Sequence, residues 1–260
     1  MKKINNQFLI ASLILLTTIS GAVAVSAEGD ATSLKSDGSV RVKGSDTTEL
    51  VDPEDPETVD PPVDPGPSTK GDLRIDYVSS VDFGTVKLTK TNRTYKALAN
   101  KIGKDSKLRG NFIQISDFRE KGSGWTLQVK QENQFQTKDY DELTGAVLSL
   151  DKGWANSSSA EKAPTVTRDT LSISNIGQVY DVARATENAG GGVWSINFGA
   201  SKDNDDNQPT TITEDAKSSA KEKVGKIARN SAVKITIPDS TKVASKEYQT
   251  KITWILSDTP

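Results

Sequence analysis

The 260-residue chain contains no cysteine and no histidine. The absence of cysteine excludes a disulfide framework and thiolate metal sites, and it fits an extracellular protein that does not rely on disulfides. The absence of histidine removes the most common general base and the most common ligand of transition metals. Carboxylates could still catalyse a reaction, but both absences favour a non-enzymatic protein without a cofactor.

Long apolar runs are scarce, and the clearest one lies near the N-terminus. Two lysines precede an apolar stretch at residues 8–16, and small residues at 25–27 predict cleavage after Ala27. The stretch is too short to favour a membrane span. We therefore expect residues 1–27 to be a signal peptide and the mature protein to be secreted without a membrane span. The C-terminal residues show neither an LPxTG-type motif nor an apolar tail, so we expect non-covalent attachment to a cell surface.

The next segment is acidic and rich in proline. Residues 28–69 have no aromatic side chain and carry eleven acidic but only three basic residues, with Asp-Pro at positions 52, 55, 60 and 64. Proline and like charges both extend a chain. We predict a disordered linker over residues 28–70 and one folded domain over residues 71–260. From Lys70 onward there are 28 basic and 24 acidic residues, a small positive excess that is compatible with an anionic polymer surface.

Short segments of alternating apolar and polar residues recur through the predicted domain. They include residues 73–78, 111–115, 125–131, 193–198, 233–237 and 248–256. This pattern is typical of an all-β domain, an antiparallel sandwich or a barrel-like fold with long loops. Residues 89–110 are predicted to be a loop. Alanines at helical spacing predict one short helix between Asp215 and Arg229, although Gly225 interrupts it.

Two of these segments contain a Trp-x-Leu motif: Trp125 and Leu127 in the first, and Trp254 and Leu256 in the last. Side chains alternate along a strand, so each tryptophan shares a face with its leucine. This alternation predicts that both tryptophans lie in the core, and Trp194 is assigned to the core for the same reason. The alternative is that Trp125 and Trp254 stack on sugar rings.

The residues around these motifs resemble the WxL cell-wall-binding domain of Gram-positive surface proteins. The first motif is Gly124-Trp125-Thr126-Leu127. The last follows the family pattern Tyr-x-x-x-[Leu/Ile]-Thr-Trp-x-Leu-x-x-x-Pro at Tyr248, Ile252, Thr253, Trp254, Leu256 and Pro260. The resemblance covers roughly residues 72–260.

This resemblance implies non-covalent attachment to the Gram-positive cell wall, with peptidoglycan as the ligand. It also implies membrane-anchored and sortase-anchored surface proteins as partners in one complex. The alternative function is a protein–protein docking module for a membrane-anchored partner. A basic, polar face would favour wall binding, whereas an exposed apolar patch or a free edge strand would favour docking.

Trp154 is a further candidate for ligand contact. It lies in the polar stretch Asp151-Lys-Gly-Trp-Ala-Asn-Ser, which is typical of a loop. An aromatic residue in a polar loop can contact a ligand, or it can simply anchor the loop. The candidate binding or motif residues are therefore Trp125, Leu127, Trp154, Tyr248, Trp254 and Leu256.

Patterns for catalysis and nucleic-acid binding are missing from the sequence. It contains no GxSxG motif, no P-loop and no arginine–aromatic stripe. A glycosidase that acts on the wall is the weaker, enzymatic alternative. Asp203, Asp205, Asn207 and Glu214 match four positions of a calcium-binding loop, but Gln208 replaces the required glycine. We interpret this match as coincidental.

Overall fold

The computed structural model describes residues 39–40, 49–62, 66–119, 122–216 and 226–258. The chain divides into two compact units, Met1–Val42 and Lys43–Pro260, and all the strands belong to the second. The expected signal peptide lies outside the described residues. Within those residues there is no helix, and hence none that could cross a membrane. The prediction of an all-β fold is confirmed.

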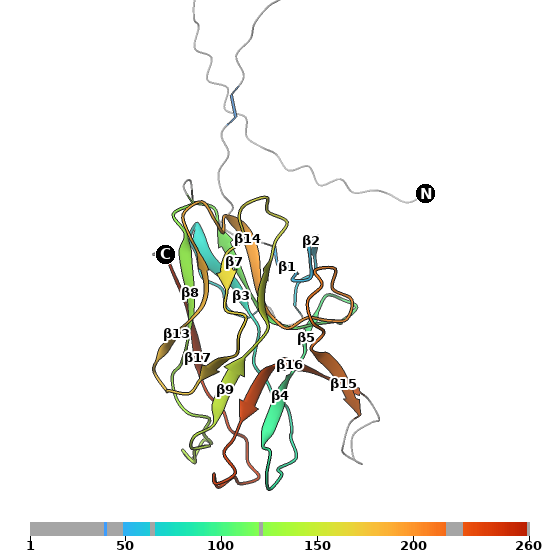
Figure 1. Cartoon of the computed structure of the whole chain (residues 1–260), viewed down its shortest axis with the longest axis vertical. Coiled ribbons are helices and arrows are strands. Elements are labelled where there is room, and N and C mark those ends of the chain that lie inside the picture. Colours follow the sequence, from blue (N-terminus) through green and yellow to red (C-terminus); the bar gives the residue numbers. More distant parts are fainter. Residues whose placement is uncertain (1–38, 41–48, 63–65, 120–121, 217–225, 259–260) are drawn as a thin grey trace, which may run out of the picture. The chain divides into compact units, whose positions relative to one another are not determined.

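Two four-stranded antiparallel sheets form the sandwich (Figure 1). The first, called the β14 sheet, has the order β10 (Gly153–Asn156), β14 (Gly192–Phe198), β7 (Asn111–Asp117) and β3 (Leu73–Val78). The second, called the β8 sheet, has the order β11 (Thr165–Val166), β13 (Val179–Ala185), β8 (Trp125–Gln131) and β17 (Ile252–Ser257). β17 therefore lies at one edge of its sheet, and β11 lies at the other.

A third sheet extends the core at one end. It contains β12 (Leu171–Ile173), β9 (Val147–Leu150), β16 (Lys226–Thr236) and β15 (Ile212–Ala216), and β4 (Thr94–Leu98) also pairs with β16. Two hairpins complete the fold: β1 (Val51–Asp52) with β2 (Asp55–Val59), and β5 (Asn100–Ile102) with β6 (Lys107–Arg109). None of the sheets in the described residues closes on itself, so the barrel-like alternative is wrong.

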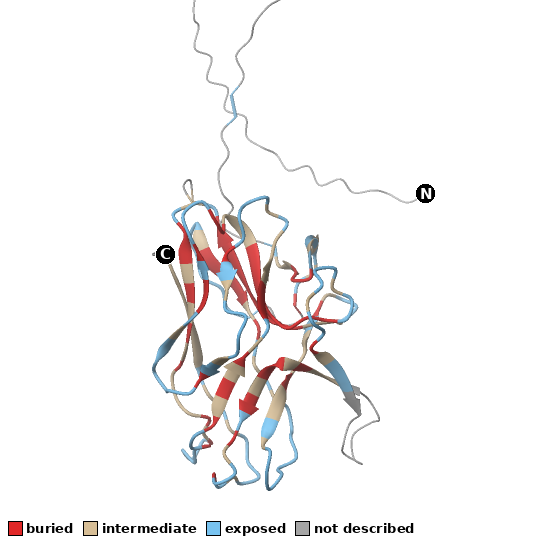
Figure 2. Cartoon of the chain, in the orientation of Figure 1, coloured by how far each residue is buried: buried red, intermediate tan, exposed pale blue. Residues whose placement is uncertain are grey.

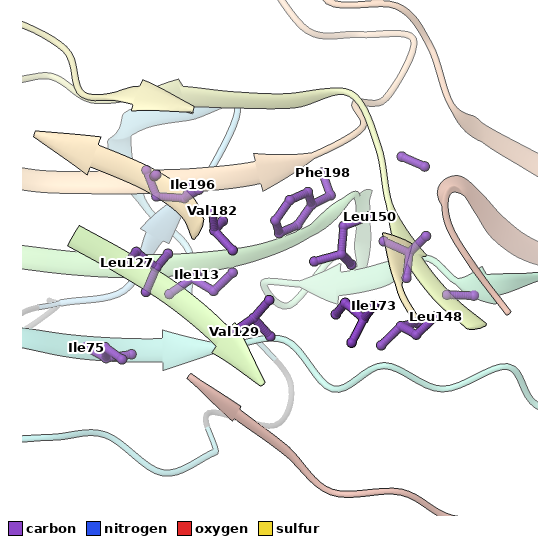
Figure 3. Packing of buried hydrophobic residues seen from close by; sticks show 14 of the residues in the cluster. Ile75, Ile113, Leu127, Val129, Leu148, Leu150, Ile173, Val182, Ile196 and Phe198 are labelled. Atoms are coloured by element: carbon purple, nitrogen blue, oxygen red, sulfur yellow. The ribbon is translucent and has the colours of Figure 1, made fainter. Parts of the chain in front are cut away.

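One continuous apolar core joins the three sheets. Figure 3 shows Leu127 and Val129 of β8 near Ile113 of β7, Ile196 of β14 and Leu148 of β9. β8 alternates between buried and half-buried residues along its whole length, as its sequence predicts. Buried residues concentrate in the middle of the sheets and exposed ones in the loops (Figure 2). Each fully buried aliphatic side chain contributes about 1.5–3 kcal/mol, so the β8 face is a major source of stability.

The helix predicted between Asp215 and Arg229 is wrong where the structure describes this segment. β15 and β16 form an antiparallel ladder, in which Asp215 faces Ile227 and Glu214 faces Ala228. Residues 217–225 lie outside the described residues. β16 also pairs with β4 and β9. Alanine has the highest intrinsic helix propensity, but hydrogen bonding to three strands outweighs the propensity of a few such residues.

The predicted loop at residues 89–110 contains β4, β5 and β6, so this prediction is also wrong. β4 pairs with β16 through the backbone, and the guanidinium of Arg229 on β16 also donates hydrogen bonds to the carbonyl oxygens of Lys96 (2.9 Å) and Phe83 (3.0 Å). Backbone pairing of this kind depends little on side-chain type. A segment rich in lysine and threonine can therefore form an edge strand without a clear apolar alternation.

The predicted linker, residues 28–70, contains folded structure. The β1–β2 hairpin belongs to the second unit, and its carboxylate at Asp52 is fully buried against the guanidinium of Arg109 (Nε 2.6 Å, Nη2 2.7 Å). Glu54 accepts a hydrogen bond from the backbone N–H of Ser201 (2.7 Å). The domain boundary predicted at Gly71 thus lies after the first two strands. Composition could not reveal this, because the partners of these acids lie far along the chain.

Burial and pairing shift the pKa values of these acids in opposite directions. Burial alone would raise the pKa of Asp52, but hydrogen bonds from Arg109 and from the Glu54 N–H hold this pKa below its ordinary value. Burial raises the pKa of Glu54, and the hydrogen bonds from Ser201 only partly oppose it. Because the Asp52 pKa is lowered, this group stabilises the fold above its unfolded pKa of about 4. That contribution is lost as the pH falls through the folded-state pKa.

We predict that Arg109→Ala lowers the free energy of unfolding by about 3 kcal/mol, because it leaves the buried Asp52 carboxylate with only the longer ion pair to Lys107 (3.5 Å). Denaturant unfolding at neutral pH measures this loss. Glu57→Ala is the matched control, since Glu57 is exposed on the same hairpin and should change stability by less than about 0.5 kcal/mol. Equal stability of the two variants would show that the ion pair does not hold the hairpin.

Candidate functional site

The first Trp-x-Leu motif lies entirely in the core. Trp125 and Leu127 have no exposed surface, and the indole Nε1 of Trp125 donates a hydrogen bond to the carbonyl oxygen of Gly190 (3.0 Å). Gly124 has a φ of +80°, and a Cβ atom there would lie 2.4 Å from the carbonyl oxygen of Ala185. The glycine before the tryptophan is therefore required by the backbone. The prediction that Trp125 is buried is confirmed.

The second motif lies directly beside the first. β17 pairs with β8 so that Leu256 faces Leu127 and Trp254 faces Val129. The Trp254 ring also approaches the Phe198 ring of the β14 sheet, with 6.3 Å between centroids. All residues of β17 are nevertheless half-buried, because the strand lies at the sheet edge. Trp254 thus packs on the core as predicted, but one part of its surface stays accessible.

Trp154 does not lie in a loop, and that prediction is wrong. It belongs to β10, where it faces Asn197 of β14, and only 4% of its surface is exposed. Its indole Nε1 donates a hydrogen bond to the carbonyl oxygen of Gly199 (3.0 Å). The polar residues nearby belong to a sheet face that the β1–β2 hairpin covers. For example, the Asn156 amide donates to the carbonyl oxygen of Pro53 in this hairpin (3.2 Å). A buried ring in this position cannot stack on a glycan.

A groove with a volume of about 1330 Å³ opens beside β17. Its apolar lining includes Ile75 and Val78 of β3, Ile252 and Trp254 of β17, and Phe83, Tyr95, Phe135 and Tyr248. On the β3 side, residues 66–69 run along the strand, and the Thr69 N–H donates to the Ile75 carbonyl (2.8 Å). The outer edge of β17 has no strand partner in the part of the chain that the structure describes.

Tyr248, the first residue of the distal motif, is half-buried in the lining of this groove. Its hydroxyl oxygen accepts a hydrogen bond from the backbone N–H of Ala244 (3.0 Å). The tyrosine therefore stabilises the turn at residues 244–248 that leads into β17. This hydrogen bond gives Tyr248 a structural role in the distal motif.

A smaller, polar cleft of about 550 Å³ adjoins the groove, and residues 246, 247, 249 and 250 line both. Tyr140 lies at this cleft with 78% of its surface exposed. On either side of it in sequence, Asp139 and Asp141 bind the ammonium group of Lys246 at 3.2 and 2.7 Å. No sequence pattern pointed to Tyr140. The argument applied to Trp154, an aromatic residue within a polar stretch, would have selected it.

Lys246, Asp139 and Asp141 form an ion-pair cluster that we call the Lys246 clamp. The contacts within it shift the pKa values of Asp141 and Lys246. The hydrogen bond from Lys246 lowers the pKa of Asp141, and the bond to Asp141 raises the pKa of Lys246. The clamp is therefore intact above the ordinary aspartate range and opens as the pH falls through the lowered pKa of Asp141.

The acidic loop that partly matches a calcium site lies between β14 and β15. The side-chain amide of Asn204 organises it by donating to the carbonyl oxygens of Ser201 (2.6 Å) and Gln208 (3.1 Å). Across the described residues, no group of three or more acidic side chains is arranged to hold a metal ion.

The comparison with known families decides what kind of domain this is. A family model described as WxL domain surface cell wall-binding matches residues 29–260. The chain belongs to this family. No match was found among curated proteins or among solved structures. The WxL family is a family of cell-wall-binding surface domains, and this gives the motifs, the groove and the cleft their functional context.

In this WxL domain the two motifs form one structural unit, because they occupy neighbouring positions on β8 and β17. We predict that Trp125→Ala lowers the free energy of unfolding by about 3–5 kcal/mol, since it empties a fully buried site. Trp254→Ala should cost clearly less, because the ring is only half-buried. Denaturant unfolding of the two variants measures the difference. A larger loss for Trp254→Ala would contradict the burial assigned to the two rings.

For the clamp of the WxL domain, we predict that Lys246→Met raises the pKa of Asp141 toward the ordinary aspartate value, because its main hydrogen-bond donor is removed. NMR titration of the Asp141 carboxyl carbon measures this shift. Lys251→Met is the matched control, since Lys251 lines the same cleft but does not bind Asp141. An unchanged midpoint in Lys246→Met would show that the clamp does not form in solution.

Proposed function

We propose that this protein is secreted and attaches non-covalently to the surface of a Gram-positive bacterium by binding peptidoglycan through its second unit. Membership of a cell-wall-binding family over nearly the whole chain is the observation that carries this proposal. The N-terminal signal-like segment supports secretion, and the lack of cysteine is compatible with an extracellular protein that does not rely on disulfides.

The proposed attachment involves no catalysis. A wall glycosidase would need two carboxyl groups facing each other across a binding cleft. The two acidic residues that line the large groove are engaged locally: Asp82 accepts the N–H of Gly84 (2.7 Å), and Glu247 accepts the amide of Gln249 (3.0 Å). These bonds form within their own turns, which supports a binding role for the groove.

A second candidate function is docking onto a membrane-anchored surface protein, with a sortase-anchored protein in the same complex. The outer edge of β17, which has no strand partner among the described residues, and the apolar groove beside it favour this candidate. An edge strand can accept an extended segment of a partner as an additional strand, and side chains of that segment would enter the groove. The proposed occupant is an extended apolar segment of the membrane-anchored partner.

Co-sedimentation with purified peptidoglycan tests the main proposal. We predict that the purified chain sediments with sacculi, both with and without their secondary polymers, because the wall glycan itself is the ligand. Muramidase digestion of the sacculi should release the protein. If the protein stays in the supernatant with both kinds of sacculi but binds the membrane-anchored partner, the first function is wrong and docking is supported.

A further inference from the structure

Tyr140 occupies a backbone position that normally suits glycine or asparagine. Its φ is +66°, in the left-handed region. Tyr140 is the last residue of a tight turn, which its N–H closes by donating to the Thr137 carbonyl (3.0 Å). A glycine or asparagine would fit there with less strain. The side chain is 78% exposed, so core packing does not require tyrosine either. A strained, exposed aromatic residue points to a functional role.

The surrounding contacts hold this tyrosine in place. The hydroxyl of Thr137 accepts the N–H groups of Asp139 (3.2 Å) and Asp141 (3.1 Å), and Lys246 bridges the carboxylates of the same two residues. At the base of the turn, Gln136 and Gln249 exchange backbone hydrogen bonds of 2.9 and 2.8 Å. The backbone that carries the ring is therefore ordered before any ligand arrives, which lowers the entropy cost of binding.

The cleft beside Tyr140 is polar but close to neutral. Its charged lining residues are Lys138, Lys246, Lys251, Asp139 and Glu247. Asp139 and Asp141 already neutralise Lys246. The side-chain amide of Gln136 has no hydrogen-bond partner within the described part of the chain and lines the cleft. An aromatic face combined with a free amide group suits a neutral polyol, whereas a polyphosphate would require a concentrated positive charge.

From these observations we infer that the Tyr140 cleft is a glycan subsite, in which an N-acetylated amino sugar stacks on the Tyr140 ring and hydrogen-bonds to the Gln136 amide. This inference deepens the proposed peptidoglycan binding and rests on it. The volume of about 550 Å³ is in the range of small-ligand sites, so the cleft accommodates one or two sugar rings of a longer strand. A longer strand could continue from the cleft into the adjoining groove, since residues 246, 247, 249 and 250 line both.

The test compares substitutions at Tyr140 in the full chain. Two binding assays are used: co-sedimentation with sacculi stripped of secondary polymers, and calorimetry with the N-acetylglucosamine tetramer. We expect Tyr140→Ala and Tyr140→Gly to weaken binding in both assays by roughly tenfold or more, because the stacking surface is removed. Tyr140→Phe keeps the ring and should bind within about twofold of the wild type. Thermal unfolding of Tyr140→Gly should stay within about 4 °C of the wild type, because glycine fits the positive φ.

Phe118→Ala is the matched control, because Phe118 is another exposed aromatic residue and does not line the cleft. It should bind like the wild type. If Tyr140→Ala and Tyr140→Gly bind sacculi and the tetramer as tightly as the wild type, the glycan subsite is wrong while peptidoglycan binding stands. If the wild type does not bind sacculi but binds the tetramer, and Tyr140→Ala weakens binding of the tetramer, the proposed function is wrong while the subsite stands. If the wild type binds neither, both are wrong.

Discussion

The pairing of β17 with β8 is the constraint on which the rest of the domain depends. It joins the end of the chain to a strand more than a hundred residues earlier and places Leu256 opposite Leu127. Such a contact closes a long loop, so it forms only if the joined faces bury enough apolar surface to offset the entropy cost. The register is also strict. A slip by one residue would turn Trp254 and Leu256 away from the core and expose them.

This arrangement places most of the two Trp-x-Leu motifs in the core, while Tyr248, Ile252 and Trp254 of the distal pattern also line the groove. The Trp-x-Leu motifs are engaged in the core, fully at β8 and partly at β17. The accessible features lie beside the closing strand: an apolar groove along its edge and a polar cleft at Tyr140. β17 lines the groove through Ile252 and Trp254, whereas the residues just before this strand line the cleft. Of the two motif tryptophans, Trp254 contributes to the lining of the groove.

Several sequence predictions failed for one physical reason: the partner of a residue can lie far along the chain. Asp52 and Glu54 have the composition of a disordered linker, yet Arg109 and Ser201 bury them. Trp154 lies among polar residues, yet its strand pairs with β14 and an N-terminal segment covers the sheet face. The alanines near residue 220 suggest a helix, yet the flanking residues pair as β15 and β16.

The sequence by itself determined the all-β class, the burial of Trp125 and the family, because alternation and motif spacing are local properties of the chain. Tertiary structure alone decided where the domain begins, which edge stays unpaired and where accessible surface remains. Tyr140 illustrates this division. Its sequence neighbours are ordinary turn residues, and only the folded chain brings Lys246 and Gln249 to its side. Long-range contacts of this kind depend on the relative placement of strands, which no local pattern encodes.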